Sequence, residues 1–424
     1  MLVIYSQEPS SSFFSVYVMA IYQTKLFTLI FIITVTSPLT PVFAIKFPTS
    51  HLNPTLFPTP PTVSKQIWFW ELIFEKYSSH INVIHAVQFP YLIIDVIDFN
   101  KFSKKYNNEE RFSRKEKEII TNRYTARYQL AIKRFKREKH KALKYGAMEK
   151  RIYSVVKSNQ DALDMLFRGK ISIRSQTGLA DEFKRAAARA KELLPYMEES
   201  FRNHGVPTVL TRIAFVESMF NIKAKSRKGA SGVWQFMPRT ARRYLIVNRF
   251  IDERNSPLKA TEAAAKLLKT NYHRLKSWPL AITAYNHGLS GIKRAVRTLS
   301  TNSISKIIKY YRSKSFGFAS KNFYAEFLAA NNVYTRHFMK SRNRTDYNPL
   351  NITFISLPSR LSIHQIMEST PIDHKILKRY NPCLSKNAYT WYRHKKLPKG
   401  FDIIIPTSIE SKTLSALNKP LRKG

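Results

Sequence analysis

One carboxylate stands inside an apolar stretch of the chain. In RIAFVESMFN, residues 212–221, the acid is Glu217; read as a helix, the stretch puts Ile213 four residues before it and Phe220 three residues after it, on the same face. Apolar neighbours exclude water and disfavour the charged form, so the pKa of the carboxyl group rises. The stretch therefore predicts an acid that tends to hold its proton. Taken alone, it is more typical of an ordinary glutamate at the edge of an amphipathic helix, so a catalytic role depends on the surrounding segments.

Three later segments offer aromatic, amide and hydroxyl groups that could share a binding site with this acid. They are Trp234 and Gln235 in GASGVWQFMP (229–238), Tyr285 and Asn286 in YNHG (285–288), and Tyr324 in NFYAEF (322–327). Sugar rings present apolar C–H faces to aromatic rings, and their hydroxyl and acetamido groups need donors and acceptors. Each segment alone is more typical of a core residue beside a turn, but together they predict a sugar-binding cleft.

The segments that position these residues are predicted to be helices. Residues 179–206 start with Asp181 at an expected N-cap and close at Gly205. Residues 208–221, with Glu217, are expected to form the next helix. Further helices are expected to start at Pro238, within 260–275, and at Pro279, where the sequence offers a first-turn proline or strong helix formers. We therefore predict a mainly α fold with a helical catalytic domain over residues 175–345.

Four ordered motifs resemble those of a known enzyme family. They are ESMFN (217–221), AKSRKGASGVWQFMPRTA (224–241), DERNSP (252–257) and AYNHG (284–288). They resemble the motifs of family 1 lytic murein transglycosylases, especially the membrane-bound lytic transglycosylase D type. The resemblance covers about residues 175–340 and implies a goose-lysozyme-like helical fold.

The resemblance implies cleavage of the β-1,4 bond between N-acetylmuramic acid and N-acetylglucosamine in peptidoglycan, leaving 1,6-anhydro ends. Glycosidases generally use two carboxylates, but here the sugar's own C6 hydroxyl would attack, so Glu217 alone would serve as acid and then as base. Substrate contacts carried over from the family are Ser218, Gln235, Tyr285, Asn286 and Tyr324. Ser218 has a rival role as a helix-packing hydroxyl. We expect no cofactor and no metal.

Three other functions compete with this one. A goose-type hydrolase would need a second carboxylate, for which Asp252 and Glu253 are the acids in the motif region, although Asp252 and Arg254 suit a structural ion pair better. A non-catalytic protein could bind peptidoglycan as a scaffold. A nucleic-acid binder would rest on the positive charge of the chain alone. It also conflicts with the signal peptide expected at residues 1–44, so nucleic acid is not an expected partner.

The N-terminal residues predict an exported protein. Lys25 precedes the apolar run 26–35, and Val42 and Ala44 suit the −3 and −1 positions of a cleavage site, so residues 1–44 read as a signal peptide. We expect translation to start at Met19. Since the single cysteine is Cys383, no lipobox is available, and the protein is expected in the periplasm or cell envelope without a lipid anchor.

The remaining segments carry most of the charge. The chain has 71 Lys and Arg against 28 Asp and Glu, a net charge of +43, which favours an anionic wall polymer or membrane surface as a further partner. Residues 45–63 read as a proline-rich linker and 64–174 as a basic helical extension. Residues 350–410 predict a β-α-α-β module similar to a divergent LysM unit, followed by a basic tail at 411–424.

Overall fold

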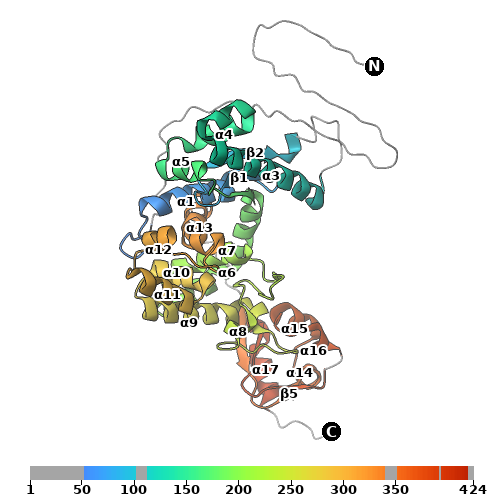
Figure 1. Ribbon diagram of the computed structural model, residues 1–424. Helices are drawn as coiled ribbons and strands as arrows, with labels where there is room; N and C mark the ends of the chain where they lie inside the picture. Colours follow the sequence, from blue (N-terminus) through green and yellow to red (C-terminus); the bar gives the residue numbers. More distant parts are fainter. Residues whose placement is uncertain (1–51, 102–111, 340–350, 391–392, 419–424) are drawn as a thin grey trace, which may run out of the picture.

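The structure, a computed structural model, describes residues 52–101, 112–339, 351–390 and 393–418 (Figure 1). Within these ranges most of the chain is helical, which confirms the mainly α fold class. The buried side chains form three hydrophobic cores. The signal peptide expected at 1–44 lies outside the described residues. In the part of the chain that is described, every helix is too short or too polar to span a bilayer.

The central core is formed by helices from two distant parts of the chain. These are α1 (Pro61–Glu71), α6 (Ala180–Asn203), α7 (Ile213–Ser218), α8 (Pro238–Ala241), α9 (Pro257–Leu275), α10 (Trp278–His287), α11 (Leu289–Leu299), α12 (Ile304–Tyr310) and α13 (Phe318–Tyr334). The predicted helices around 260–275 and from Pro279 are confirmed as α9 and α10. In α9, the Ser256 side chain accepts from the Lys259 N–H, and Pro257 occupies the first turn.

Helix α13 runs through the middle of this core, between α1 and α10 (Figure 1). Nearly every side chain from Ser320 to Tyr334 is buried, as expected for a helix surrounded by others. Two of its buried asparagines form hydrogen bonds with α1. The Trp70 Nε1–H donates to Asn322 Oδ1 over 3.2 Å, and Asn332 Nδ2 donates to Glu71 Oε1 over 2.9 Å. These hydrogen bonds offset the cost of burying the polar atoms that form them.

The segment expected as a linker packs against the central core where the structure describes it, from residue 52 onward. Phe57 is 3% exposed and its ring lies 6.0 Å from that of Phe327. Helix α1 begins at Pro61, and the Thr62 hydroxyl is bonded to that of Ser305 over 2.7 Å. Residues 52–63, expected as part of a proline-rich extended linker, instead pack against the central core and enter a helix at Pro61, because this segment contains an aromatic side chain that the core buries.

A second core lies on the N-terminal side of α6 and contains a three-stranded sheet. Its elements are β1 (Ile81–Ala86), β2 (Ile93–Asp98), α3 (Arg114–Glu138), α4 (Ala147–Val156), α5 (Gln160–Phe167) and β3 (Ile173–Thr177). The strand order is β2-β1-β3, antiparallel throughout. Strand β1 serves both cores, since Val83 packs into the central one and Ile84 into this one. The expected extension at 64–174 thus includes strands that the helical expectation missed.

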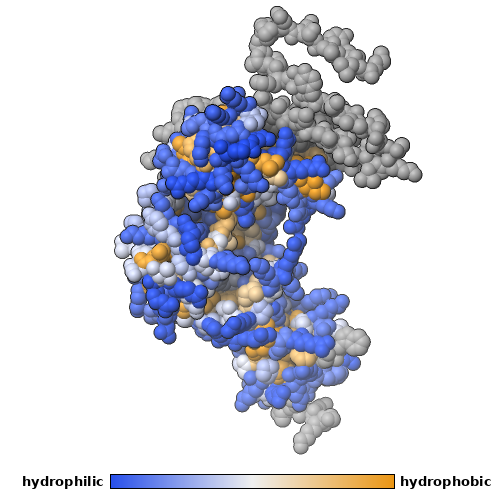
Figure 2. Space-filling view, viewed as in Figure 1, coloured by the Kyte–Doolittle hydropathy of each residue, from blue (hydrophilic) through white to orange (hydrophobic). Residues whose placement is uncertain are grey.

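Basic side chains cover this second unit. Helix α3 starts with a capping box between Ser113 and Glu116 and buries Tyr124, Tyr128 and Phe135, while most of its Lys and Arg residues are exposed. Figure 2 shows hydrophilic residues over most of the visible face of this unit. The charge of the segment is therefore displayed at the surface, as a solvated helix face requires.

The C-terminal unit contains the two predicted helices between two paired strands, together with two short strands, a short third helix and a final helix that were not predicted. Its elements are β4 (Ile352–Ser356), β5 (Leu361–Ser362), α14 (Ile363–Ser369), α15 (His374–Tyr380), α16 (Lys386–Tyr389), β6 (Lys396–Leu397), β7 (Asp402–Pro406) and α17 (Glu410–Leu417). Strands β4 and β7 pair antiparallel, and β5 pairs with β6. The tail expected from residue 411 is helical as far as Leu417.

This unit docks on the central one through backbone hydrogen bonds. The Asp252 N–H donates to the Cys383 carbonyl over 2.8 Å, and the Ser385 N–H donates to the Phe250 carbonyl over 2.9 Å. Ile251 belongs to the C-terminal hydrophobic core. Lys259 of α9 also forms an ion pair with Asp402 of β7. The contacts fix the C-terminal unit against the loop that precedes α9.

Candidate active site

Glu217 lies in the last turn of α7, just before the chain turns sharply. A 3-10 turn over Thr208–Arg212 leads into α7, which ends at Ser218 because Met219 and Phe220 adopt left-handed φ values of 51° and 56°. The prediction of one helix over 208–221 therefore holds for residues 213–218, while 208–212 form a 3-10 turn and 219–221 lie outside the helix. Phe220 is not on the helical face of Glu217, and its buried ring packs edge-on against Phe215 at 4.6 Å.

The turn after Glu217 is held from α6. The Arg189 side chain donates to the Met219 carbonyl from Nε over 3.2 Å and from Nη2 over 2.8 Å, and also pairs with Glu182. Left-handed backbone is costly for residues other than glycine. These hydrogen bonds and the burial of Phe220 offset that cost. The position of the carboxylate thus depends on α6 as well as on its own helix.

The Glu217 carboxyl group is partly buried, and burial raises its pKa to about 8. Ile213, one turn earlier, is fully buried beside it. The direction agrees with the sequence-based expectation, because desolvation penalises the carboxylate more than the neutral acid. Near neutral pH this group holds a proton. It can therefore donate that proton to a substrate atom and take one back.

The loop that follows α7 is bonded to Ser218, the residue after Glu217. The Ser218 hydroxyl donates to the Val233 carbonyl over 2.7 Å. Gln235, with a left-handed φ of 48°, donates from its amide to the Gly232 carbonyl over 2.8 Å and to the Ala224 carbonyl over 3.1 Å. Ser218 and Gln235 are both partly exposed. The structure thus gives both predicted substrate contacts a role in holding this loop.

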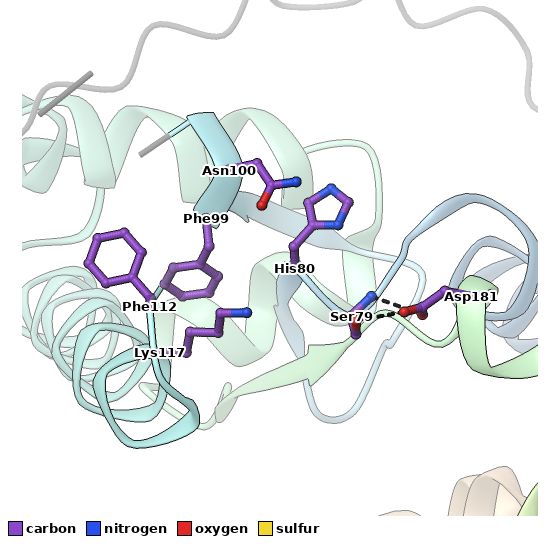
Figure 3. A pocket seen from close by; sticks show the side chains of 7 residues that line it. All are labelled: Ser79, His80, Phe99, Asn100, Phe112, Lys117 and Asp181. Atoms are coloured by element: carbon purple, nitrogen blue, oxygen red, sulfur yellow. Dashed lines mark hydrogen bonds between the residues drawn. The ribbon is translucent and has the colours of Figure 1, made fainter. Parts of the chain in front are cut away.

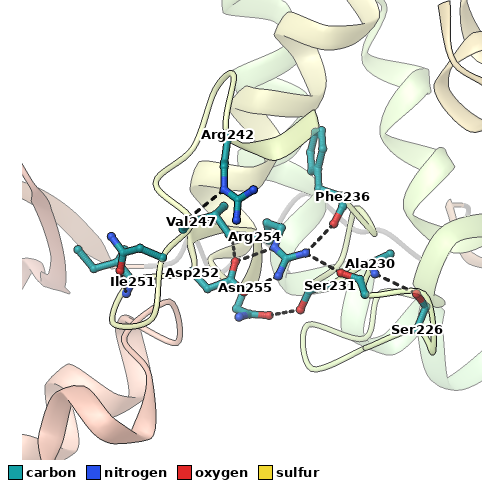
Figure 4. A network of polar contacts seen from close by, with 12 residues as sticks. Ser226, Ala230, Ser231, Phe236, Arg242, Val247, Ile251, Asp252, Arg254 and Asn255 are labelled. Carbon is teal, nitrogen blue, oxygen red and sulfur yellow. Dashed lines mark hydrogen bonds and ion pairs between the residues drawn. The ribbon is translucent and has the colours of Figure 1, made fainter. Parts of the chain in front are cut away.

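Arg254 joins the two ends of that loop (Figure 4). Its guanidinium donates to the Gly229 carbonyl over 2.7 Å and to the Phe236 carbonyl over 3.1 Å, and it pairs with Asp252 at 2.7 Å. The expected structural pair of Asp252 and Arg254 is confirmed. Glu253 accepts from the Ile246 N–H over 2.7 Å, and burial raises its pKa. Both acids of DERNSP are thus engaged in holding loops.

Tyr285 is a predicted site residue whose phenol is influenced by the Glu217 charge. Its hydroxyl donates to the Trp234 carbonyl over 2.8 Å. Burial, together with the Glu217 charge, raises the pKa of Tyr285 well above its ordinary value. Trp234 itself is buried, and its indole N–H donates to Thr261 over 2.9 Å, so it supports the core. Tyr285 therefore links the loop to the neighbourhood of the acid.

The side chains of the other two predicted contacts form hydrogen bonds with other segments of the chain. Asn286 is exposed and accepts from the Ser320 hydroxyl over 2.9 Å, joining α10 to α13. Tyr324 is only 1% exposed, and its hydroxyl donates to the Pro58 carbonyl over 3.0 Å. The structure therefore uses Tyr324 to seat the N-terminal segment. A substrate contact by its hydroxyl is not compatible with this burial.

One acid near Glu217 was missed by sequence reasoning. Glu326 of α13 is partly exposed; burial and the neighbouring Glu217 charge raise the pKa of Glu326 to about 8, while Arg174 opposes the rise. Glu326 lies in the quoted segment NFYAEF, two residues after Tyr324. A carboxylate in a segment already chosen for its polar groups was the available signal. Its approach to Glu217 depends on the packing of α7 on α13.

A separate cavity of about 290 Å³ lies between the sheet of the second core and the start of α6 (Figure 3). It contains serine, histidine and aspartate side chains. The Ser79 hydroxyl donates to Asp181 over 2.7 Å, whereas His80 lies 3.9 Å from Asp98. Among the described residues no hydrogen bond joins Ser79 to His80, so this is not a nucleophile–base pair. Asp181 accepts from the Ser79 backbone too, which corrects its expected role as an N-cap.

Comparisons with known proteins concern the region around Glu217. Residues 196–308 match the family model described as "Transglycosylase SLT domain". Over 112 residues the chain is 30% identical to membrane-bound lytic murein transglycosylase D of Escherichia coli (strain K12), covering 26% of this chain and 25% of that protein. Over 115 residues it is 30% identical to a protein of Alteromonas sp. (strain M-1) named for tributyltin chloride resistance, covering 27% and 56% respectively.

Two solved structures are also similar in part. One is an inactive mutant of lytic transglycosylase Slt from Pseudomonas aeruginosa, with 18% identity, a TM-score of 0.26 and coverage of 44% of this chain and 28% of that one. The other is the 70 kDa soluble lytic transglycosylase from Escherichia coli, with 16% identity, a TM-score of 0.29 and coverage of 48% and 37%. This chain thus spans about a quarter to about half of the curated relatives that it matches.

Proposed function

We propose, on the premise that residues 196–308 form a transglycosylase SLT domain, that this chain is a lytic murein transglycosylase that cleaves peptidoglycan glycan strands. The observation that carries the proposal is the Glu217 carboxyl group, whose pKa is raised to about 8 by burial inside the matched region. A carboxyl group that is protonated near neutral pH suits general acid catalysis at a glycosidic oxygen.

The proposed reaction needs only one acid. Glu217 gives its proton to the O4 atom of the leaving N-acetylglucosamine while the bond from C1 of N-acetylmuramic acid to O4 breaks. The C6 hydroxyl of the same muramic residue then forms a bond to C1 and passes its proton to Glu217. The product is a 1,6-anhydro end, and no water is consumed. Because the nucleophile is part of the substrate, its attack is intramolecular.

Other residues would support binding. Ser218, Gln235 and Tyr285 hold the loop beside the acid, and their partly exposed groups would face the sugar next to the cleaved bond. The C-terminal unit would bind glycan as a LysM-like module. The basic surface would approach an anionic wall polymer or membrane. Export to the periplasm or cell envelope through the segment 1–44 belongs to the same proposal.

A goose-type muramidase is the second candidate, and the position of Glu326 favours it. Hydrolysis would use a second carboxylate to activate water, and Asp252 and Glu253 are engaged elsewhere. Burial first, and the Glu217 charge second, raise the pKa of Glu326 to about 8, so Glu326 lies within the electrostatic field of Glu217. A hydrolase would leave reducing ends, which are heavier by one water than anhydro ends.

Glu217→Gln tests the proposal. Purified murein is digested with the wild type, with Glu217→Gln and with Glu192→Gln, an exposed carboxylate on α6 that serves as the control. We expect anhydro products from the wild type and the control, and a rate about 10²- to 10⁴-fold lower for Glu217→Gln, with retained murein binding. Reducing ends would establish the muramidase, and binding without any cleavage by the wild type would establish a non-catalytic scaffold.

A further inference from the structure

We propose that the outer face of α3 binds the surface of an anionic lipid bilayer. This face consists of five exposed residues, Lys115, Ile119, Arg123, Leu130 and Lys133. The inference goes beyond the proposed cleavage of murein, because it decides which of two anionic partners the basic surface meets. Membrane binding does not depend on that reaction, so the two can be tested separately.

Two large aliphatic side chains stand on the side of α3 that faces away from its core. Ile119 is 43% exposed and Leu130 is 52% exposed. Because successive helical residues are rotated by about 100°, Leu130 lies only about 20° around the axis from Ile119 and about 16 Å further along it. The buried side, which carries Tyr124, Tyr128 and Phe135, lies about 140–180° away from Ile119. Ile119 and Leu130 therefore form a separate ridge and do not belong to the edge of the core.

Basic side chains flank this ridge on both sides. Lys115 and Lys133 lie about 40° to one side of Ile119, and Arg123 lies about 40° to the other side. Within the described part of the chain, the ion pairs of α3 involve other side chains. The three charges are therefore available to an external anion.

The charge of α3 is positive overall. The helix has nine Lys and Arg residues against three Glu residues. Glu116 is the acid of α3 nearest to the outer face, about 60° from Ile119, and its carboxylate accepts from the Ser113 N–H over 2.7 Å. A positive surface attracts an anionic partner. Near an anionic leaflet, each Lys or Arg raises the affinity about fivefold.

The aliphatic ridge favours a lipid bilayer over a soluble anionic polymer. A hydrated polymer would bind the cations but would leave Ile119 and Leu130 in water. At a bilayer surface, the headgroup phosphates meet the cations while the apolar side chains between them enter the acyl boundary and leave water. The alternation of cations and aliphatic residues on one face therefore fits the bilayer.

Tyr145 adds an aromatic ring beside this face. It ends the 3-10 segment Lys139–Tyr145 that follows α3, and it is 53% exposed. The Arg134 guanidinium carbon lies 5.1 Å from the centroid of its ring, and Arg134 is about 60° around α3 from Ile119. Tyrosine is enriched at membrane interfaces because its ring is apolar and its hydroxyl stays in water. Tyr145 would thus support the same contact.

The position of α3 lets the rest of the molecule stay clear of the bilayer. The unit that contains α3 lies at the opposite end of the molecule from the C-terminal unit (Figure 1). Strand β1 joins this unit to the central core, because its residues belong to both cores. Binding through α3 would therefore hold the central core near the membrane, with the C-terminal unit at the far end.

Sedimentation of the full chain with lipid vesicles tests the inference. Vesicles of phosphatidylglycerol with phosphatidylethanolamine present an anionic surface, and vesicles of phosphatidylcholine present a neutral one. The apolar run 26–35 is the same in every variant, so binding to neutral vesicles measures its contribution. We expect the wild type to bind the anionic vesicles at least about tenfold more tightly, and added salt to reduce the difference.

Two double variants separate the ridge from the charge. Ile119→Gln with Leu130→Gln leaves the charge unchanged, so affinity for anionic vesicles should fall about tenfold while affinity for soluble polyphosphate stays at the wild-type value. Arg123→Gln with Lys133→Gln should weaken both, by about 25-fold for the vesicles. The matched control is Lys412→Gln with Leu414→Gln, which changes an exposed Lys and an exposed Leu on α17 and should bind as the wild type does.

Three outcomes would overturn the inference. Wild-type vesicle affinity in Ile119→Gln with Leu130→Gln would leave an anionic polymer as the partner. Equal binding of the wild type to anionic and neutral vesicles would remove the role of charge. A wild-type dimer in analytical ultracentrifugation that the same variant dissociates would make this face a contact between two copies. Failure of the proposed function is distinct, because it would show as a wild type that binds vesicles and cleaves no murein.

Discussion

Gly232 is the position where one added methyl group should disturb the site most. Its φ is 79°, and a Cβ there would overlap the Arg254 carbonyl oxygen and stand 2.7 Å from the carbonyl carbon. Backbone atoms cannot turn aside as a side chain does. In Gly232→Ala, either the loop over 229–236 or the chain at Arg254 must therefore move, and the Arg254 hydrogen bonds to Gly229 and Phe236 would be strained.

The expected cost has two parts. Left-handed backbone costs an alanine about 1–2 kcal/mol, and insertion of a methyl group into filled space costs about 1–3 kcal/mol. Gly232→Ala should thus lower the free energy of unfolding by about 2–5 kcal/mol. Gly229→Ala is the matched control, because Gly229 also has a positive φ, 88°, but nothing lies within 4 Å of its Cβ position. Gly229→Ala should therefore lose only the about 1–2 kcal/mol that left-handed backbone costs an alanine.

Urea unfolding of both variants beside the wild type measures the difference, with the m-value checked for a change in mechanism. Murein cleavage is measured on the same samples, and we expect Gly232→Ala to lose activity while Gly229→Ala retains it. If the two variants are equally stable and equally active, the close approach of Gly232 to Arg254 does not exist in solution, and the account of this loop is wrong.

Two further predictions concern Glu217 and Tyr285. In the folded state the pKa of Glu217 is raised to about 8, above its unfolded value. The contribution of this group to stability therefore falls as the pH rises from about 4.5 to about 8. Urea midpoints should show that Glu217→Gln gains stability relative to the wild type at pH 9 but not at pH 4. Parallel pH profiles for the two proteins would contradict the burial of this carboxyl group. Tyr285→Phe removes the hydrogen bond to the Trp234 carbonyl and should cost about 0.5–1.5 kcal/mol, whereas the exposed Tyr310→Phe should cost almost nothing; equal midpoints would show that the Tyr285 bond adds no stability.

Local chemistry made part of the structure predictable. The raised pKa of Glu217 follows from apolar residues such as Ile213 one turn away, and helix α9 follows from Ser256, Pro257 and the alanines after them. The Asp252 and Arg254 pair could be expected because the two side chains are two residues apart in a tight turn. Such features depend on neighbours in the sequence, so the sequence carries them directly.

Contacts between distant segments were not predictable in the same way. Phe220 takes a left-handed conformation because a core aromatic ring and Arg189 hold the turn. Tyr324 points toward Pro58, 266 residues away, and not toward the acid. The charges of Glu217 and Arg174 reach Glu326 only because distant segments pack around α13. Periodicity within one helix gives the faces of that helix but does not say which partner covers each face.

The docking of the C-terminal unit has a consequence for how a polymer would be cut. Hydrogen bonds from Asp252 to Cys383 and from Ser385 to Phe250, with the ion pair between Lys259 and Asp402, hold this unit in one position relative to Glu217. If the C-terminal unit grips glycan as proposed, the distance from the grip to the scissile bond is constant. The cleavage products would then have a narrow range of lengths, set by this constant distance.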